Sequence, residues 1–265
     1  DGIPSIDNPK FVSIDDANNY LKDNEPGISY KSGNTSRFYP YQILVWHEIV
    51  NDTVEGERVL VTYCPLCGSG IVFDPIVGGE RVEFGTSGKL WNSNLVMYDR
   101  KTKSYWSQIL GKSIVGPMTN VELPILKHDI TSFGQWKAQN PNGEVLSKDT
   151  GAIRFYGTDP YGDYYTNDKI LFPVSNKNND LDPKEFVLGI IVNGNAKAYV
   201  PSSIQKLGIV VDSFQGEEIT LKFIDEIDAV HIFITENGKL KRINPFSTFW
   251  FAWAAVHPKT DLYKN

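Results

Sequence analysis

The chain has 265 residues, of which 41% are hydrophobic, and this is enough to bury a core in one large domain or two small ones. Its net charge is −6 and its Lys and Arg residues are scattered, which argues against a nucleic-acid or anionic-membrane surface. No apolar stretch approaches the length of a transmembrane helix, so none is expected in this chain.

Several features of the composition favour an extracytoplasmic protein. Aromatic residues are frequent (14 Phe, 13 Tyr and 6 Trp), and this suits strands and outward-facing domains. Asn34 and Asn51 match the acceptor pattern for N-glycosylation. The chain begins at Asp1 without an initiating Met or a signal peptide. We interpret it as a trimmed mature form whose upstream segment held a signal or a lipid anchor, and we expect it to be secreted, periplasmic or on the cell surface.

The first predicted elements are a short helix over residues 14–21, which begins after Ser13, and a hairpin over residues 28–38. Glycine and proline residues then interrupt an alternation of apolar and polar residues that is typical of short strands. The elements expected there are a short helix begun by Pro40, a turn at Glu55-Gly56, a strand over 58–63 and a hairpin turn at Gly78-Gly79.

The middle of the chain predicts more strands and one further helix. The helix covers residues 132–139 and ends before Pro141. Residues 157–167, dense in Tyr, Asp and Gly, form a loop that is either a lid or a surface loop packed by its own tyrosines. The remaining elements are strands over 94–99, 104–109 and 112–115 and a linker over 176–184.

The sequence also contains an internal repeat. A shift of 160 residues keeps the turns, the short helix and the strands in register without a gap. The identical pairs are Tyr39/Tyr199, Ile49/Ile209, Val50/Val210, Asp52/Asp212, Gly56/Gly216, Glu57/Glu217, Phe73/Phe233 and Gly78/Gly238. We interpret the repeat as an internal duplication.

The fold class that this repeat predicts is α+β, mainly antiparallel β, with two lobes and a few short helices. We expect a helical lead-in over residues 1–27. The first lobe, over residues 28–175, carries a Cys-x-x-Cys pair and an insertion. The second lobe, over residues 176–265, is a degenerate copy.

Positions that differ between the copies indicate where they specialised. The first copy has polar or reactive residues where the second has mostly apolar residues or Gly. The pairs are His47/Leu207, Glu48/Gly208, Asn51/Val211, Cys64/Ile224 and Cys67/Ile227. The functional residues are therefore expected in the first copy, whereas the shared Tyr, Asp and Gly positions are interpreted as scaffold.

The chain resembles a known family through a set of motifs rather than through the cysteines alone. The motifs are Tyr63-Cys64-Pro65-Leu66-Cys67-Gly68-Ser69, residues 46–52, 84–88, 94–100 and 105–108, and the closing stretch 250–258. Over residues 28–258 the sequence is similar to the secreted proteins grouped as domain-of-unknown-function family 3179. The resemblance implies exported prokaryotic proteins, often lipoprotein-like, without a settled activity.

The two cysteines, which are the only ones in the chain, predict a metal site as their first use. Thiolates and an imidazole are ligands that Cu(I) and Zn(II) accept. We expect Cys64 and Cys67 to bind copper or zinc together with His47, with Met97 as a soft fourth ligand that favours copper. Zinc would prefer Glu48 to the thioether. The function hypothesis is an extracytoplasmic metal-binding protein, copper favoured, in metal handling or redox.

Other uses of the pair remain open. Cys64 and Cys67 could be a redox dithiol of a thiol-dependent oxidoreductase. One of them could be the nucleophile of a hydrolase, with His47 as base, Asn51 or Asp52 as orienting residue and Ser87 nearby. They could also form a structural disulfide in a non-catalytic interaction module. The sequence leaves open whether the protein is an enzyme, and it names no protein partner.

Overall fold

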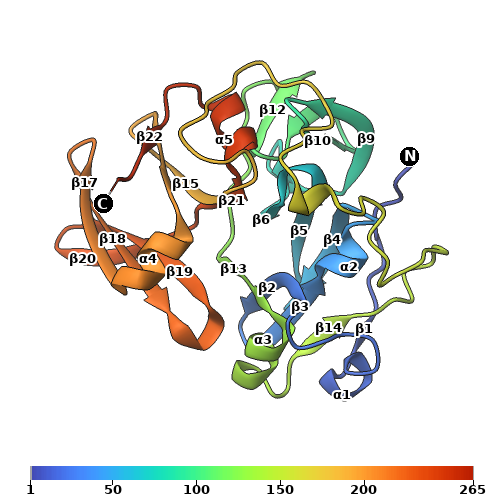
Figure 1. The fold of residues 1–265 in the computed structure, drawn as a ribbon. Coiled ribbons are helices and arrows are strands. Elements are labelled where there is room, and N and C mark those ends of the chain that lie inside the picture. Colours follow the sequence, from blue (N-terminus) through green and yellow to red (C-terminus); the bar gives the residue numbers. More distant parts are fainter. Residues whose placement is uncertain (1, 265) are drawn as a thin grey trace.

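The computed structural model describes residues 2–264 and confirms an α+β protein dominated by antiparallel strands (Figure 1). Asp1 and Asn265, the outer ends of the predicted lead-in and second lobe, lie outside the described residues. Within the described range, no helix has the length and apolarity needed to cross a membrane.

The first segment (residues 26–73) is built from two antiparallel units joined by a short helix. The hairpin β2–β3 comes first, and the three-stranded sheet β4–β5–β6 follows the helix. The bounds are β2 (Pro26–Ser32), β3 (Thr35–Pro40), α2 (Tyr41–Leu44), β4 (Ile49–Val54), β5 (Glu57–Cys64), the 3-10 turn η1 (Pro65–Cys67) and β6 (Ser69–Phe73). Alternation and turn residues therefore gave the correct order of elements.

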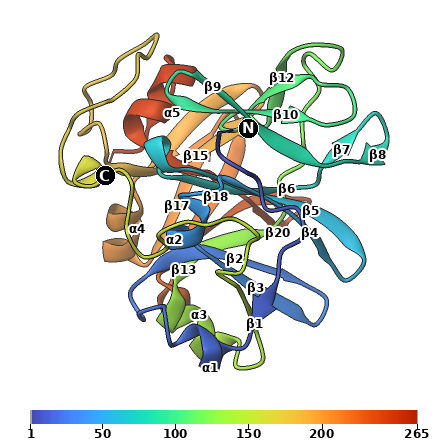
Figure 2. The same ribbon diagram turned by 90° about the vertical axis from the view of Figure 1, so that its right-hand side faces the viewer.

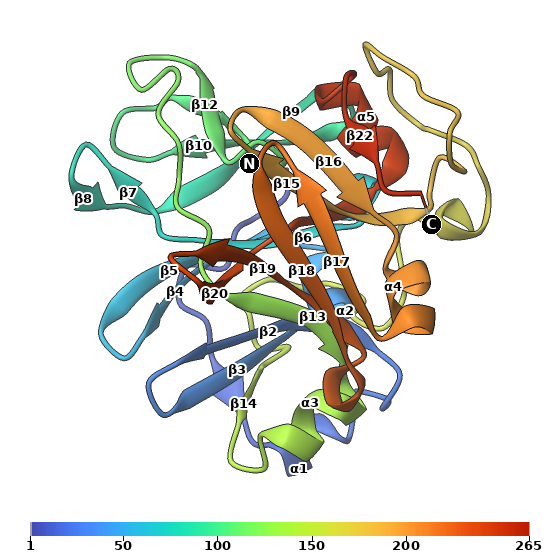
Figure 3. The same cartoon turned by 90° about the vertical axis from the view of Figure 1, so that its left-hand side faces the viewer.

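The second segment (residues 186–233) lies beside the first and repeats its element order (Figures 1 and 3). The bounds are β15 (Phe186–Val192), β16 (Asn195–Tyr199), α4 (Pro201–Leu207), β17 (Ile209–Phe214), β18 (Glu217–Ile224), the 3-10 turn η3 (Asp225–Ile227), β19 (Ala229–Glu236) and, beyond the segment, β20 (Lys239–Ile243).

The strands of the two segments pair in the same register at an offset of 160. The pairs Ile28–Tyr39, Ile49–Thr62 and Cys64–Ser69 recur as Leu188–Tyr199, Ile209–Lys222 and Ile224–Ala229. Past Phe73 the offset drops by one residue, so the expected match of Gly78 with Gly238 is wrong, and Gly79 is the equivalent turn residue. Shared register is what a duplication predicts, and the common origin itself stays a prediction.

Each segment is completed by a strand–helix–strand unit that the sequence repeat did not include. These units match at an offset of 117, which pairs Trp136 with Trp253. Their outer strands extend the hairpins, antiparallel on one side and parallel on the other. The bounds are β13 (His128–Ser132), α3 (Phe133–Gln139), β14 (Glu144–Leu146), β21 (Phe246–Phe249), α5 (Trp250–Val256) and β22 (Asp261–Leu262).

Between β6 and β13 the first copy holds extra strands, which form a hairpin and a four-stranded sheet (Figure 2). They are β7 (Ile76–Val77), β8 (Glu80–Arg81), β9 (Phe84–Trp91), β10 (Asn94–Asp99), β11 (Tyr105–Ser107) and β12 (Lys112–Val115). The remaining elements are β1 (Phe11–Val12), α1 (Ile14–Ala17) and the 3-10 turn η2 (Tyr164–Thr166). The helix α1 is shorter than expected, since beyond Ala17 the chain continues in tighter turns, with the Asn19 amide bonded to the Asp16 carbonyl and the Tyr20 amide to the Ala17 carbonyl.

One apolar core cluster places the cysteines at a junction. It contains Cys64 and Cys67 of the first segment, Met97 and Trp106 of the extra sheet, and Phe251 of α5. The cysteine turn is thus surrounded by the first segment, the extra strands and the helix that completes the second segment.

A triad of a basic residue, Asp and Tyr recurs in both segments at positions that the two copies share. In the first segment Asp52 accepts hydrogen bonds from the Tyr39 hydroxyl at 2.5 Å and from the Arg37 guanidinium at 2.7 Å. In the second, Asp212 bonds Tyr199 at 2.9 Å and Lys197 at 2.6 Å. The triad ties each hairpin to the following strand.

Replacing Asp52 by alanine is expected to lower the free energy of unfolding by about 3 kcal/mol, because it leaves the buried Tyr39 hydroxyl without its partner and the half-buried Arg37 with Glu144 as its remaining ion-pair partner. The matched Asp212→Ala variant should lose less, because Asp212 is more exposed. Chemical denaturation of both variants checks this order, and equal losses would contradict it.

Candidate functional site

The two cysteines lie at the ends of a tight turn between adjacent strands. Cys64 ends β5, and Cys67 ends the 3-10 turn that Gly68 closes with a left-handed backbone (φ 59°). The same turn recurs in the second segment, where Asp228 (φ 49°) closes it and isoleucines replace the cysteines. The turn is therefore a property of the scaffold, and the thiols are specific to the first segment.

Both cysteines are free thiols and both are buried. The Cys67 thiol donates a hydrogen bond to the Ser93 carbonyl oxygen at 3.3 Å, and its sulfur accepts a hydrogen bond from the Asn94 side-chain amide at 3.6 Å. Burial raises the pKa of Cys67 well above its usual range, and the hydrogen bond and charge of neighbouring Cys64 add to this. Cys67 is thus held as a protonated thiol next to its partner.

A buried polar network fixes the residues that contact Cys67. The Asn94 amide nitrogen also donates to the Gln108 side-chain oxygen at 2.9 Å, and its oxygen accepts from the Ile109 amide at 3.0 Å. Gln108 in turn donates to the Ser69 carbonyl at 3.1 Å. Neither Asn94 nor Gln108 was predicted as a site residue, although both lie in the motifs that carry the family resemblance.

Glu48 is the second unusual group near the thiols. It is 6% exposed and adopts a left-handed backbone (φ 58°), which is strained for a residue with a side chain. Its carbonyl accepts the Tyr63 amide at 2.8 Å, next to Cys64. Gly208 occupies the matched position (φ 74°) and accepts the same bond from Phe223. The backbone therefore prefers glycine here, and the first segment retains a carboxyl group.

The environment of Glu48 changes its acidity. Burial raises its pKa to about 7, and its charge contributes to raising the pKa of Cys67 and of Tyr161. Among the described residues its carboxyl group has no hydrogen-bond or ion-pair partner. Near neutral pH Glu48 is therefore a group that can take up or release a proton beside the thiols.

The predicted loop of residues 157–167 covers the cysteine turn. Tyr164 is buried in the same cluster as the cysteines, and its hydroxyl donates to the Leu66 carbonyl at 2.8 Å. The Lys184 amine lies 3.5 Å from the centre of the Tyr164 ring and also binds the Tyr164 carbonyl. We call residues 161–165 the tyrosine segment. Its tyrosine rings pack on one another, as the alternative of a loop packed by its own tyrosines expected, and opening of this segment as a lid stays a prediction.

Removing the Tyr164 hydroxyl is expected to loosen the packing of the tyrosine segment over the cysteine turn. The Tyr164→Phe variant loses one hydrogen bond to Leu66, and the thiols of the folded protein should react about fivefold faster with an alkylating reagent. Tyr156→Phe is the matched control, because its hydroxyl bonds Thr150 and His47. Equal acceleration in both variants would contradict a specific role of Tyr164.

The structure does not bring His47 and the cysteines together as a metal-ligating set. His47 is buried, and its ring nitrogens lie 2.7 Å from the Pro4 carbonyl and 2.6 Å from the Tyr156 hydroxyl. No group of three or more His, Cys, Asp or Glu side chains placed to hold a metal ion occurs in the described part of the chain. Met97 is fully buried in the apolar cluster of the cysteines.

The other residues of the nucleophile alternative have structural partners. Asn51 donates to Asp7 at 2.8 Å and exchanges two hydrogen bonds with the Phe84 backbone. Asp52 belongs to the scaffold triad, and the Ser87 hydroxyl bonds the Val96 carbonyl. A Cys–His–Asn arrangement is therefore not assembled.

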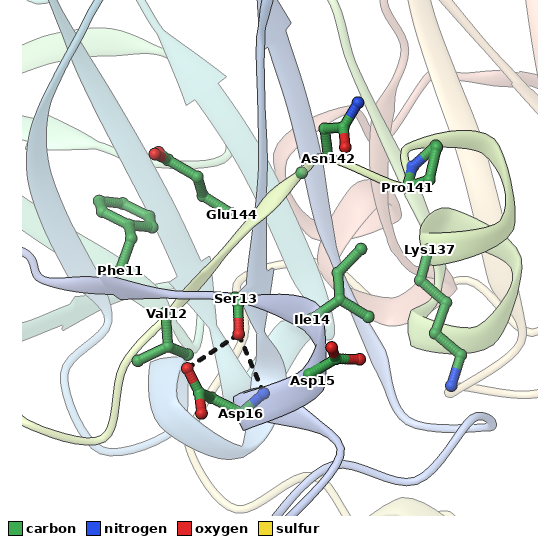
Figure 4. A pocket seen from close by; sticks show the side chains of 11 residues that line it. Phe11, Val12, Ser13, Ile14, Asp15, Asp16, Lys137, Pro141, Asn142 and Glu144 are labelled. Atoms are coloured by element: carbon green, nitrogen blue, oxygen red, sulfur yellow. Dashed lines mark hydrogen bonds between the residues drawn. The ribbon is translucent and has the colours of Figure 1, made fainter.

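A pocket of about 760 Å³ lies away from the thiols, between α1 and α3 (Figure 4). The Ser13 hydroxyl in its wall caps α1: it accepts the Asp16 amide at 3.1 Å and donates to the Asp16 carboxylate at 2.8 Å. Its ionisable groups are surface residues. The arrangement carries no chemistry comparable to that of the thiols and Glu48.

Comparison with known proteins gives one match. No curated protein and no solved structure matches the chain. The sequence model of the family described as protein of unknown function (DUF3179) matches residues 1–237, which is most of the chain and includes the cysteine turn, Glu48 and the Asn94–Gln108 network. The chain therefore belongs to the DUF3179 family.

Proposed function

We propose that the protein carries out thiol–disulfide exchange at Cys64 and Cys67, with Glu48 as the proton acceptor. The observation that carries the proposal is the Glu48 carboxyl group, which is buried on a strained backbone and whose charge acts on one of two free, buried thiols, Cys67. All three positions are apolar or glycine in the second segment. Strain that is retained at one of two matched positions favours a functional role for Glu48.

The proposed reaction balances without a cofactor. The Cys64 thiol loses its proton as it attacks one sulfur of a substrate disulfide, and the other substrate sulfur leaves and takes up that proton. Cys67 then gives its proton to Glu48 and attacks Cys64, and the second substrate sulfur leaves as a thiol with the proton that Glu48 returns. The substrate gains two electrons and two protons, and the protein ends with a Cys64–Cys67 disulfide.

Exchange requires the covered thiols to become accessible. Cys64 and Cys67 are 1% and 0% exposed, and the tyrosine segment packs against their cluster. We propose that this segment moves when the substrate binds. An oxidising, extracytoplasmic compartment is where a cycling disulfide of this kind would be expected, and this location also stays a proposal.

The test traps the intermediate. Reduced Cys67→Ser protein treated with oxidised glutathione should form a stable adduct at Cys64, whereas the wild type should form an internal disulfide without a retained adduct. Mass spectrometry of the folded proteins distinguishes these products. Folded wild-type protein whose thiols both stay unmodified would overturn the proposal.

Metal binding stays the second candidate, favoured by the adjacency of two thiols in one cluster with Met97. Thiolates select soft ions such as Cu(I). Participation of His47 would require it to give up the bond to Pro4 or Tyr156. Titration of reduced protein with Cu(I) and Zn(II) against a chelator, repeated with Cys64→Ser and His47→Ala, decides which ligands take part. Binding that is unchanged in Cys64→Ser would remove this candidate.

A further inference from the structure

A pocket of about 450 Å³ lies where the first segment, the loop after residue 156 and the second segment meet, and we call it the junction pocket. It touches Tyr63 and Gly68, which directly flank the cysteine turn. Its lining residues are mostly apolar or aromatic. They are Glu25, Pro26, Tyr41, Gln42, Val45, Tyr63, Gly68, Ile130, Gly157, Thr158, Asp159, Tyr165, Phe186 and Phe249.

A second pocket, of about 320 Å³, lies at the matched positions and serves as an internal comparison. Pro26 and Phe186, which match each other at the offset of 160, line both pockets. Three further matched pairs differ between the two linings, with the junction-pocket residue first: Tyr41/Pro201, Gly68/Asp228 and Phe249/Ser132, whereas Ile130 lines both pockets. The junction pocket thus has aromatic or apolar residues where the matched pocket has smaller or polar ones.

The other residues that line the two pockets also differ, being charged in the matched pocket and aromatic in the junction pocket. The matched pocket contains Asp129 and Arg242, whose side chains form an ion pair at 2.5 Å. The junction pocket instead has the stacked rings of Tyr41 and Tyr63, with centres 4.0 Å apart, together with Tyr165. Aromatic walls of this kind bind flat apolar groups by stacking and by edge-to-face contacts.

The charges around the junction pocket restrict the ligand further. Glu25 and Asp159 are the charged residues among its lining residues, and no Lys, Arg or His belongs to that set. The carboxylate of Glu25 accepts a hydrogen bond from the Gln42 amide. An anionic ligand would therefore meet like charge without a compensating cation.

We infer that the junction pocket binds a planar aromatic molecule that carries no negative charge. The ligand would lie against Tyr63, Tyr165 and Phe249, beside the cysteine turn. The inference goes beyond the proposed exchange reaction and does not depend on it, since binding requires neither thiol to react.

The experiment compares two fluorescent probes of one scaffold, N-phenylnaphthylamine, which is neutral, and anilinonaphthalene sulfonate, which is anionic. Folded protein of residues 1–265 should bind the neutral probe saturably at one site and the sulfonate more weakly. Phe249→Ser removes an aromatic wall and places at the start of α5 the residue type that caps α3. Thr158→Trp fills the pocket from an exposed loop position.

Each of these two variants should weaken binding of the neutral probe by at least about fivefold. Asp228→Gly is the matched control in the other pocket, because glycine fits its left-handed backbone (φ 49°), and it should bind as the wild type does. Absence of saturable binding, equal binding of the sulfonate, or unchanged binding in both Phe249→Ser and Thr158→Trp would each overturn the inference. The same titration on a Cys64→Ser/Cys67→Ser protein should give wild-type binding.

Discussion

Replacing Glu48 by glutamine is expected to slow thiol–disulfide exchange by about 100-fold near neutral pH, the usual size of a general-base contribution. Glutamine keeps the shape of the side chain and the strained backbone but cannot accept the proton of Cys67. Because the pKa of Glu48 lies at about 7, the wild-type rate should rise through an inflection near that pH. In Glu48→Gln this inflection should vanish, and only the rise from thiol ionisation should remain.

The measurement is stopped-flow oxidation of reduced protein by a small disulfide over a range of pH. Glu48→Gly is the companion variant, since Gly208 shows that the scaffold accepts glycine at this position. It should exchange as slowly as Glu48→Gln while gaining about 1 kcal/mol of stability from relieved backbone strain. A wild-type pH profile retained in both variants would exclude Glu48 as the proton acceptor.

The second large effect concerns stability against pH. Burial raises the pKa of Glu48 from 4.5 to about 7. Between these two pH values the folded protein keeps the Glu48 proton, whereas the unfolded chain has released it. The stabilisation is complete below pH 4.5 and is lost as the pH rises through about 7. The free energy of unfolding should therefore fall by about 3 kcal/mol more in the wild type than in Glu48→Gln.

Denaturant unfolding of reduced wild type and Glu48→Gln at several pH values gives this difference directly. Other buried groups, such as His128 and His257, whose pKa values burial lowers, change the stability of both proteins equally and cancel in the comparison. Parallel stability curves for the two proteins would mean that Glu48 keeps an ordinary pKa in the folded state.

Pattern and register allowed much of the fold to be predicted. Identities such as Tyr39/Tyr199 extend through turns and strands, and the observed pairing follows the same offset. The completing units, α3 and α5 with their strands, could not be found in this way. The extra strands β7–β12 of the first copy reduce the offset from 160 between the segments to 117 between the completing units. Few residues besides Trp136 and Trp253 are identical in these two units.

The site was predicted only in part, for physical reasons. Differences between the copies pointed to Cys64, Cys67 and Glu48, on which the proposed function rests, because a shared scaffold makes an unshared polar residue visible. The partners of His47 could not be read in advance, since Pro4 and Tyr156 are distant in sequence. The contact of Tyr164 with Leu66 depends equally on how a long loop folds back.

The most direct test of the account is a redox titration of the folded wild-type protein in buffers of reduced and oxidised glutathione. The fraction of Cys64–Cys67 disulfide is measured by acid quenching, alkylation and mass spectrometry. The account predicts a single, reversible two-electron transition between the dithiol and the internal disulfide, with the fold retained throughout. Thiols that stay free across the whole series, or that oxidise only once the protein has unfolded, would contradict it.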